Sequence, residues 1–185
     1  APVAILESTP QIKRQTDIAI VGMSGQFPGA PKLDDFWSLL SEGRHAFTDL
    51  PQDRGWNLDD FPPTYVQRGA FLDGVDEFDP LFFQISPKEA MTMDPTERLF
   101  LQQSWRAIED AGIVPEKVAG SPWGVFCGNG GDYTLLLREV TGYSPHVTLC
   151  QVPARVSHYL DLTGPCQSVD AACGSALLAV AQACE

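Results

Sequence analysis

Short apolar runs that end at a small residue recur along this sequence, and segments with helical spacing separate them. Residues 17–22 read DIAIVG, residues 123–128 read WGVFCG, and a shorter run covers residues 167–170. Apolar runs of roughly four to eight residues that are closed by turn signals are typical of buried strands. Strands that alternate with helices in this way predict an α/β layered fold.

The best-defined helix is expected to run from Pro95 to Ala111. Asp94 supplies an N-cap, proline suits the first helical turn, and Glu97 stands three residues after the cap. Apolar residues then recur at helical spacing until Gly112, which is typical of a helix end. A second helix start is expected where Ser86 precedes a proline.

Weaker patterns predict further helices and irregular segments. One helix is expected around residues 36–40, capped by Asp34 or Asp35 and ending near Gly43. The others are expected from Tyr133 onward, at residues 152–160 and at residues 175–185. Residues 1–16 are predicted to be a linker, and the folded domain is predicted to cover residues 17–185. Residues 45–86 are rich in proline, glycine and aspartate, and their aromatic side chains indicate a loop that packs against the rest of the fold.

The composition excludes several classes of protein. The net charge is −12, from 24 acidic and 12 basic residues, whereas nucleic-acid surfaces need clustered lysine and arginine. No apolar run approaches the ~20 residues of a membrane span. The five cysteines form no CxxC pair and have no histidine at zinc-ligand spacing. We therefore expect free thiols in a cytoplasmic protein, without a metal site and without a nucleic-acid or membrane partner.

Cys173 occupies the most informative position among the cysteines. A predicted strand leads into it, small residues (Ala171, Ala172, Gly174) surround it, and a predicted helix follows. A helix starting at this cysteine would place unpaired backbone N–H groups and the positive end of the helix dipole beside the thiol, which favours a reactive thiolate. The same N–H groups would stabilise an oxyanion. The alternative is a small buried side chain, as free cysteines usually are, and the spacing alone favours that alternative.

Several sequence motifs that follow one another along the chain favour the reactive thiol over the buried side chain. They are DIAIVGMSGQFPGA (17–30), GAFLDGVDEFDPLFFQISPKEAMTMDPTERLFLQQSWRAIEDAGI (69–113), WGVFCG (123–128) and RVSHYLDLTGPCQSVDAAC (155–173). With them the chain resembles the β-ketoacyl synthase (ketosynthase) domain of modular type I polyketide synthases, from about Asp17 to Glu185. The resemblance implies the N-terminal half of a thiolase-like layered fold, which is duplicated and five-layered when complete.

The resemblance also implies a chemistry and partners. Cys173 would be the catalytic nucleophile, with its backbone N–H as an oxyanion donor. It would take an acyl chain from the phosphopantetheine arm of an acyl carrier protein, and decarboxylative Claisen condensation would then elongate the polyketide. No cofactor is expected to be bound, because the substrates arrive on carrier proteins. The remainder of the ketosynthase domain and other polyketide synthase domains are implied partners, and the family is usually homodimeric.

The sequence departs from the family pattern beside the cysteine. The family usually has Thr-Ala-Cys-Ser-Ser-Ser, whereas this chain has Ala-Ala-Cys-Gly-Ser-Ala at residues 171–176, so Gly174 and Ala176 replace two serines. The replacements are small and compatible with the turn. We expect them to alter rate and substrate preference more than the nucleophile itself.

The histidines of the chain do not match the catalytic ones of the family. His158 stands where the family usually has an aromatic residue, and we expect it to be structural or exposed. His45 and His146 lie in predicted loops. The family's two catalytic histidines, a lysine and a glycine-rich loop lie downstream of its cysteine and match no residue here. Two functions therefore stay open: part of a condensing enzyme, or a non-catalytic docking or structural module of a polyketide synthase.

Overall fold

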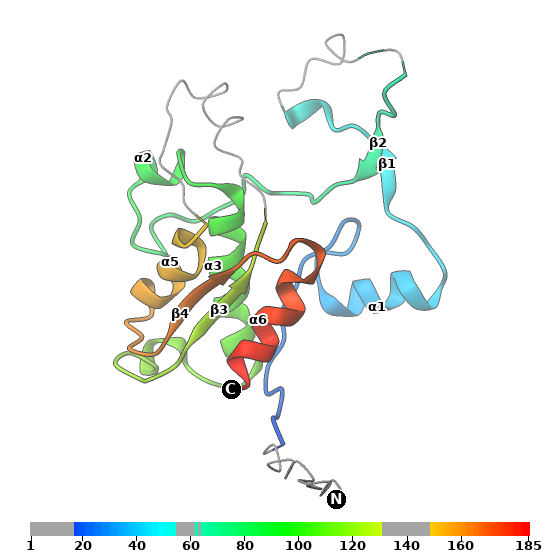
Figure 1. Cartoon of the computed structure of the whole chain (residues 1–185). Coiled ribbons are helices and arrows are strands. Elements are labelled where there is room, and N and C mark those ends of the chain that lie inside the picture. Colours follow the sequence, from blue (N-terminus) through cyan, green and yellow to red (C-terminus); the bar gives the residue numbers. More distant parts are fainter. Residues whose placement is uncertain (1–16, 55–61, 63, 131–148) are drawn as a thin grey trace, which may run out of the picture.

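A computed structural model describes residues 17–54, 62, 64–130 and 149–185 of the chain. The predicted linker at residues 1–16 and the helix predicted from Tyr133 lie outside these residues. The described chain contains both helices and strands, and Figure 1 shows two parts. One contains two strands with α3, α5 and α6, and the other contains α1 and a small hairpin.

Two parallel strands form the centre of the larger part. β3 (Val125–Gly128) pairs with β4 (Cys166–Val169), with Val125 opposite Cys166 and Gly128 opposite Val169. The sequence prediction of strands in both places is confirmed. Parallel strands need a long crossover connection. Here α5 (Gln151–Tyr159) lies within that connection and confirms the helix predicted at residues 152–160.

Helices cover both faces of this strand pair. Val125 and Cys127 are buried, and Val125 belongs to a cluster with residues of α3 (Pro95–Asp110) and α5. Side chains alternate between the two faces of a strand, so Gly128 faces the other side. There its backbone meets the start of α6 (Ser175–Ala183), which lies in front of the strands in Figure 1.

The helix starts follow the capping signals of the sequence. Asp94 caps α3 by accepting a hydrogen bond from the backbone N–H of Thr96 at 2.7 Å, and Pro95 occupies the first turn. The helix ends at Asp110 with Ala111 as its C-cap, and the next residue is Gly112, whose φ of 71° suits glycine. Ser86 likewise caps α2 (Pro87–Ala90) through a 3.1 Å hydrogen bond from the N–H of Glu89.

Two ion pairs that share Arg155 join three helices. Arg155 on α5 donates from Nε to Glu97 on α3 at 2.7 Å and from a terminal nitrogen to Glu89 on α2 at 2.6 Å. The side chain of Glu97 is only 2% exposed. Burial raises the pKa of Glu97 above its usual value, and the Arg155 guanidinium opposes that rise. Glu97, which the sequence suggested as part of a helix cap, instead holds α3 against α5.

The core lies where α3, α5 and β3 meet the loop before α2. Leu101 is 1% exposed and lies among other buried apolar side chains. Its buried neighbours in this cluster are Phe83, Ile85, Ala90, Met93, Val118, Val125, Val156 and Leu160. Phe83 stacks on Phe78 and meets the ring of Tyr159 edge-on, with centroids 5.2 and 5.1 Å apart. Part of the irregular segment at residues 45–86 therefore packs through its aromatic rings, as expected; Trp56 and Phe61 lie outside the described residues.

The smaller part contains elements that the sequence patterns identified only partly. α1 (Leu33–Ser41) confirms the helix expected near residues 36–40, and Gly43 follows it with a φ of 63°. Its N-cap is Lys32, so Asp34 and Asp35 lie in the first turn instead of capping it. A hairpin of β1 (Phe47–Asp49) and β2 (Arg68–Ala70) lies within a segment that we expected to be irregular. Two short 3₁₀ turns, η1 (Gln52–Arg54) and η3 (Pro115–Lys117), lie in the connections.

The strand expected at residues 17–22 is wrong in this structure. These residues form no ladder with any described strand, and Ile20 is 80% exposed. Gly22 instead lies so close to α3 that an added Cβ would be 2.2 Å from the carbonyl oxygen of Ala107. The N–H of Met23 donates to Asp110 at 2.9 Å. No described strand pairs with this segment, and it packs against the end of α3 instead.

Candidate functional site

Cys173 lies in a tight turn between β4 and α6. The strand ends at Val169, a 3₁₀ turn, η4, covers Ala172–Gly174, and α6 starts at Ser175. The strand-to-helix turn predicted at the cysteine is confirmed, as is the helix predicted at residues 175–185, and Cys173 itself lies in the 3₁₀ turn that precedes this helix. The side chain of Cys173 is exposed, as are its neighbours Ala172 and Gly174.

The backbone before the cysteine is strained. Ala172 has a φ of 50°, a left-handed conformation that residues other than glycine adopt uncommonly. Such conformations cost about 1–3 kcal/mol and persist where the surrounding structure holds them. Strained residues of this kind cluster at functional sites, which makes the turn at Cys173 a candidate site on conformational grounds.

Hydrogen bonds hold this turn from both ends. The Ser175 hydroxyl accepts from the N–H of Ala171 at 2.9 Å and donates to the carbonyl of Ala172 at 2.7 Å. Asp170 accepts from the N–H of Ala172 at 3.2 Å. Ser175 is 5% exposed, so its hydroxyl fixes the turn from the inside.

The backbone N–H of Cys173 differs from the neighbouring N–H groups in its hydrogen bonding. The N–H of Gly174 donates to Ala171 at 3.0 Å, and the N–H of Ser175 donates to Ala172. With the N–H groups of Ala171 and Ala172 also engaged, only that of Cys173 among residues 171–175 has no hydrogen-bond partner within the described part of the chain. A free N–H on the residue that carries the thiol suits an oxyanion donor.

Close packing fixes α6 against the end of β3. A Cβ added to Gly128 would lie 2.5 Å from the carbonyl oxygen of Ser175 and 2.5 Å from the N–H nitrogen of Ala176. Only glycine permits this approach of a strand to a helix backbone. The final glycine of the WGVFCG run therefore positions the start of α6, and with it the turn at Cys173.

The other cysteines lie in different surroundings. Cys127 is buried on β3, and burial, assisted by the neighbouring Cys166, raises the pKa of its thiol to about 11. Burial and then Cys150 raise the pKa of the Cys166 thiol above its usual value. All five cysteines are free thiols. Cys127 is therefore a structural side chain, as its apolar setting suggested.

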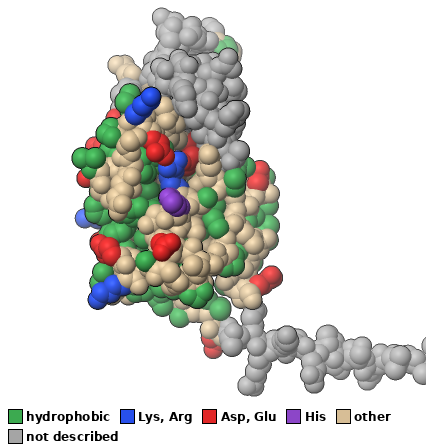
Figure 2. Space-filling model, turned by 90° about the vertical axis from the view of Figure 1, so that its left-hand side faces the viewer, with side chains coloured by type: hydrophobic (Ala, Val, Ile, Leu, Met, Phe, Trp, Pro, Cys, Tyr) green, Lys and Arg blue, Asp and Glu red, His purple; other side chains and the backbone are tan. Residues whose placement is uncertain are grey.

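Neither described histidine lies in the turn. His45 is exposed beside β1, with its ring 5.8 Å from that of Phe47. His158 is exposed on α5, which agrees with the expectation of a structural or surface residue, and a histidine is visible on the face shown in Figure 2. His146 lies outside the described residues.

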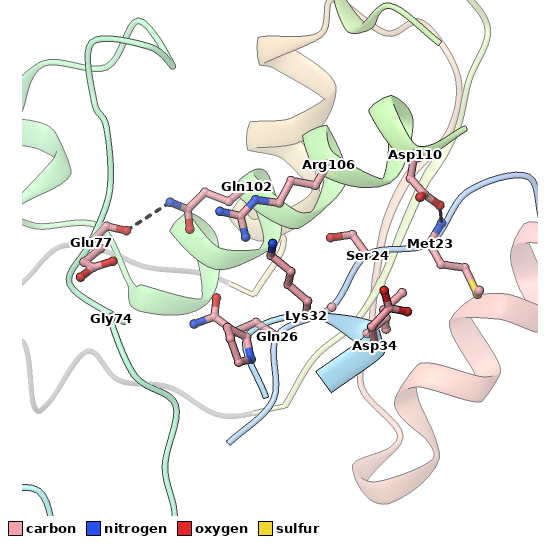
Figure 3. A pocket seen from close by; sticks show the side chains of 13 residues that line it. Met23, Ser24, Gln26, Lys32, Asp34, Gly74, Glu77, Gln102, Arg106 and Asp110 are labelled. Atoms are coloured by element: carbon pink, nitrogen blue, oxygen red, sulfur yellow. Dashed lines mark hydrogen bonds between the residues drawn. The ribbon is translucent and has the colours of Figure 1, made fainter. Parts of the chain in front are cut away.

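A cavity that the sequence did not suggest lies elsewhere in the molecule. It has a volume of about 780 Å³ and is formed by the loop after residue 22, by residues 74–77 and by the polar side of α3 (Figure 3). No residue of the turn at Cys173 lines it. Its charged residues are of both signs: Lys32, Arg106, Asp34, Glu77 and Asp110. The side chain of Gln102 spans one edge by donating to the carbonyl of Glu77 at 3.1 Å.

No helix among the described residues combines the length and apolar character that crossing a lipid bilayer requires.

Comparisons with known proteins agree with the motifs. Residues 15–185 match the family "Beta-ketoacyl synthase, N-terminal domain". The chain is 44% identical over 173 residues to polyketide synthase PksM of Bacillus subtilis, covering 90% of this chain and 4% of that protein. It is 44% identical over 174 residues to mycoketide-CoA synthase of Mycobacterium tuberculosis, covering 88% of this chain and 4% of that protein.

Solved structures give the same relationship. The ketosynthase from module 6 of the bacillaene synthase of Bacillus subtilis matches with a TM-score of 0.79 and 36% identity, over 89% of this chain and 28% of that one. The oxazolomycin ketosynthase domain OzmH KS7 of Streptomyces albus matches with a TM-score of 0.79 and 36% identity, over 89% of this chain and 31% of that one.

The chain belongs to the β-ketoacyl synthase family. Within that family it corresponds to the N-terminal portion of a modular polyketide synthase ketosynthase domain, with the thiolase-like fold of such domains. It spans less than a third of the solved ketosynthase structures and about 4% of the two synthases named above.

Proposed function

We propose that these residues form the acyl-accepting part of a ketosynthase domain and that Cys173 is its nucleophile. The observation that carries the proposal is the turn itself: an exposed thiol follows a residue with a φ of 50°, and the N–H of the same cysteine is the one left unpaired in residues 171–175. A nucleophile on a strained strand-to-helix turn is accessible from solvent, and its own N–H faces no competing acceptor.

The first step is a transfer between thioesters. The Cys173 thiolate attacks the carbonyl carbon of an acyl group held on the phosphopantetheine arm of an acyl carrier protein. The carbonyl oxygen becomes an oxyanion that accepts a hydrogen bond from the Cys173 N–H. Collapse of this intermediate breaks the bond to the carrier sulfur, which leaves as a thiolate and takes up a proton. The acyl chain is then a thioester of Cys173, without any metal or bound cofactor.

The second step belongs to the complete domain. A malonyl-type extender on a carrier protein loses carbon dioxide, and the resulting carbanion attacks the Cys173 thioester, which releases the thiolate and extends the polyketide chain. In the family this step needs histidines that match no residue of this sequence. We therefore assign acyl transfer to these residues and condensation to the assembly that they form with the remainder of the domain.

The proposal includes boundaries and partners. Residues 1–16 form a linker, and residues 17–185 form the N-terminal portion of the domain, in which Cys173 lies close to the last residue. The partners are an acyl carrier protein, other polyketide synthase domains, the rest of the ketosynthase and a second copy in a cytoplasmic homodimer. Nucleic acids and membranes are not among them, which agrees with the net charge of −12.

Intact-protein mass spectrometry with a simple acyl thioester tests the proposal. We expect one adduct per chain, lost in Cys173→Ala and retained in the matched variant Cys166→Ala. Cys166 is also exposed, but it lies on β4 and not in the turn, and burial raises the pKa of its thiol above its usual value. Adducts spread over several cysteines, or an adduct that persists in Cys173→Ala, would contradict the proposal.

A non-catalytic docking or structural module is the second candidate. The observation in its favour is apolar surface that no described residue covers, including Leu177 at 80% and Val180 at 61% exposure on α6. This candidate predicts that Cys173 reacts no faster than the other exposed cysteines. The same mass spectrometry experiment therefore separates the two functions.

A further inference from the structure

Ser175 is a buried polar residue next to the turn that carries Cys173. It is 5% exposed, and its hydroxyl bonds to backbone groups on both sides of Ala172. The hydroxyl accepts from the N–H of Ala171 at 2.9 Å and donates to the carbonyl of Ala172 at 2.7 Å. A hydroxyl can donate and accept at the same time, so this one side chain bridges the turn.

The carbonyl that Ser175 holds belongs to the same peptide group as the N–H of Cys173. A peptide group is planar, and in the trans form its C=O and its N–H point in opposite directions. The peptide between Ala172 and Cys173 is trans. Because the carbonyl of Ala172 points toward the Ser175 hydroxyl, the N–H of Cys173 points away from this buried serine.

Only the carbonyl end of this peptide group is held within the described part of the chain, where the N–H of Cys173 has no acceptor. Ser175 supplies both donors that this carbonyl has there, its hydroxyl and its backbone N–H. The preceding N–H, that of Ala172, is held separately by Asp170 at 3.2 Å. The direction of the Cys173 N–H therefore depends on Ser175.

The left-handed conformation of Ala172 increases this dependence. Its φ of 50° is unfavourable for a residue with a Cβ and persists where the surrounding structure holds it. The Ser175 hydroxyl bonds on both sides of this residue. Without that bridge Ala172 would be freer to relax toward ordinary backbone angles. Any change in its ψ rotates the peptide group that carries the Cys173 N–H.

We propose that Ser175 is a positioning residue that directs the Cys173 N–H toward the oxyanion formed during acyl transfer. The inference rests on the proposed role of Cys173 as the nucleophile, and it assigns the orientation of the oxyanion donor to a second residue. Ser175 takes no part in bond making or breaking. It acts through the peptide group between Ala172 and Cys173. The alternative is a hydroxyl that only stabilises the start of α6.

Two reactions of the same thiol separate these roles. Attack of Cys173 on an acyl thioester builds negative charge on the carbonyl oxygen, which an oxyanion donor stabilises. Alkylation by iodoacetamide displaces iodide from a saturated carbon and forms no oxyanion. Mass spectrometry measures both rates at Cys173 on the full chain, with the acetyl thioester of N-acetylcysteamine as the acyl donor. The temperature is kept below the unfolding midpoint of every variant.

The measured quantity is the ratio of the acylation rate to the alkylation rate. In Ser175→Ala we expect it to fall by about tenfold, less than the ~100-fold or more that removal of an oxyanion donor costs. The smaller fall is expected because the backbone N–H of residue 175 still donates to the carbonyl of Ala172.

Two further variants separate the hydroxyl from packing and stability. Ser168→Ala removes a hydroxyl of β4 that donates to Asn129 at 2.6 Å, outside the turn, and should leave the ratio unchanged. Ser175→Thr keeps the hydroxyl and adds a methyl group at a buried position. It should therefore lower the unfolding midpoint while the ratio stays near that of the wild type.

Each other outcome contradicts a specific claim. A ratio that stays at the wild-type value in Ser175→Ala, whether or not both rates fall, overturns this inference and leaves the nucleophile in place. An equal fall of the ratio in Ser175→Thr also overturns it, because packing and not the hydroxyl would then set the ratio. A wild type that forms no Cys173 adduct with the thioester overturns the proposed function and this inference together.

Discussion

The two faces of the β3–β4 pair differ in how completely this chain covers them. On the α3 and α5 face, Leu101, Met93 and Val156 are at most 3% exposed. On the other face, α6 buries Ser175 and Ala179 but leaves Leu177 80% and Val180 61% exposed. In Figure 1, α6 lies in front of the strands.

This difference indicates which part of the molecule holds the nucleophile in place. Stability varies within a protein, and segments with few buried apolar contacts open first. The core cluster of the α3 and α5 face includes Val125 of β3, whereas the buried side chains of α6 are Ser175 and Ala179. The turn at Cys173 thus leads into a helix that few buried side chains hold in place.

Truncating one leucine on each face should give the largest contrast. Leu101→Ala removes a fully buried side chain and is expected to lower the free energy of unfolding by about 2–5 kcal/mol. Leu177→Ala, at an exposed position, is expected to change it by less than about 0.5 kcal/mol. Denaturant unfolding of both variants measures the difference. Comparable losses at the two positions would mean that α6 is covered in solution and would break the comparison.

A methyl group at the junction of β3 with α6 should have an intermediate effect. Gly128→Ala forces a Cβ against the backbone of Ser175, and overpacking of this kind costs about 1–3 kcal/mol. Because the displaced segment begins at the turn, acylation of Cys173 should slow as well. Denaturant unfolding and adduct formation measure the two effects, with Gly130→Ala as a control that should preserve both. An unchanged acylation rate in a destabilised Gly128→Ala would show that α6 does not position the cysteine.

Titration of Glu97 should give the smallest effect, and it concerns only the face that α3 and α5 cover. Burial raises the pKa of this carboxyl above the usual 4.5, so the folded state holds its proton more tightly than the unfolded state. Its contribution to stability is full below pH 4.5 and is lost as the pH rises through the folded-state pKa. The free energy of unfolding of the wild type minus that of Glu97→Gln should therefore fall as the pH rises across this range.

Denaturant unfolding of both proteins at several pH values measures that change. Leu177→Ala compared with wild type serves as the pH-independent reference. A difference that grows with rising pH would mean that the Arg155 ion pair outweighs burial in setting the pKa of Glu97.

Local signals explain what the sequence predicted well. The caps at Ser86 and Asp94 and the end at Gly112 act within a few residues, so the starts of α2 and α3 and the end of α3 lie where these signals indicate. The apolar runs ending at Gly128 and Val169 formed strands because each provides the other's partner. The run at residues 17–22 has the same pattern but no partner, and Gly22 packs on α3 instead.

The site was predictable in outline and not in detail. The pattern around Cys173 indicated a strand, a turn and a helix. The positive φ of Ala172 depends on tertiary contacts of the turn, and the small residues in the sequence there do not predict such contacts. The pairing of Glu97 with Arg155 joins residues far apart in the sequence, and each alone resembles an ordinary surface charge. The closeness of Gly128 to Ser175 likewise follows from the packing of β3 and α6, which no local pattern encodes.

The Ser175 hydroxyl couples the geometry of the nucleophile to the formation of α6. Its two hydrogen bonds run from the first residue of α6 back to Ala171 and Ala172, so they exist only once that helix has formed. A chain with a complete core but an unformed α6 would carry Cys173 on an ordinary flexible loop. Molecules in which α6 is unfolded would then lack the strained turn, and the ability to accept an acyl chain would itself report that this helix had formed.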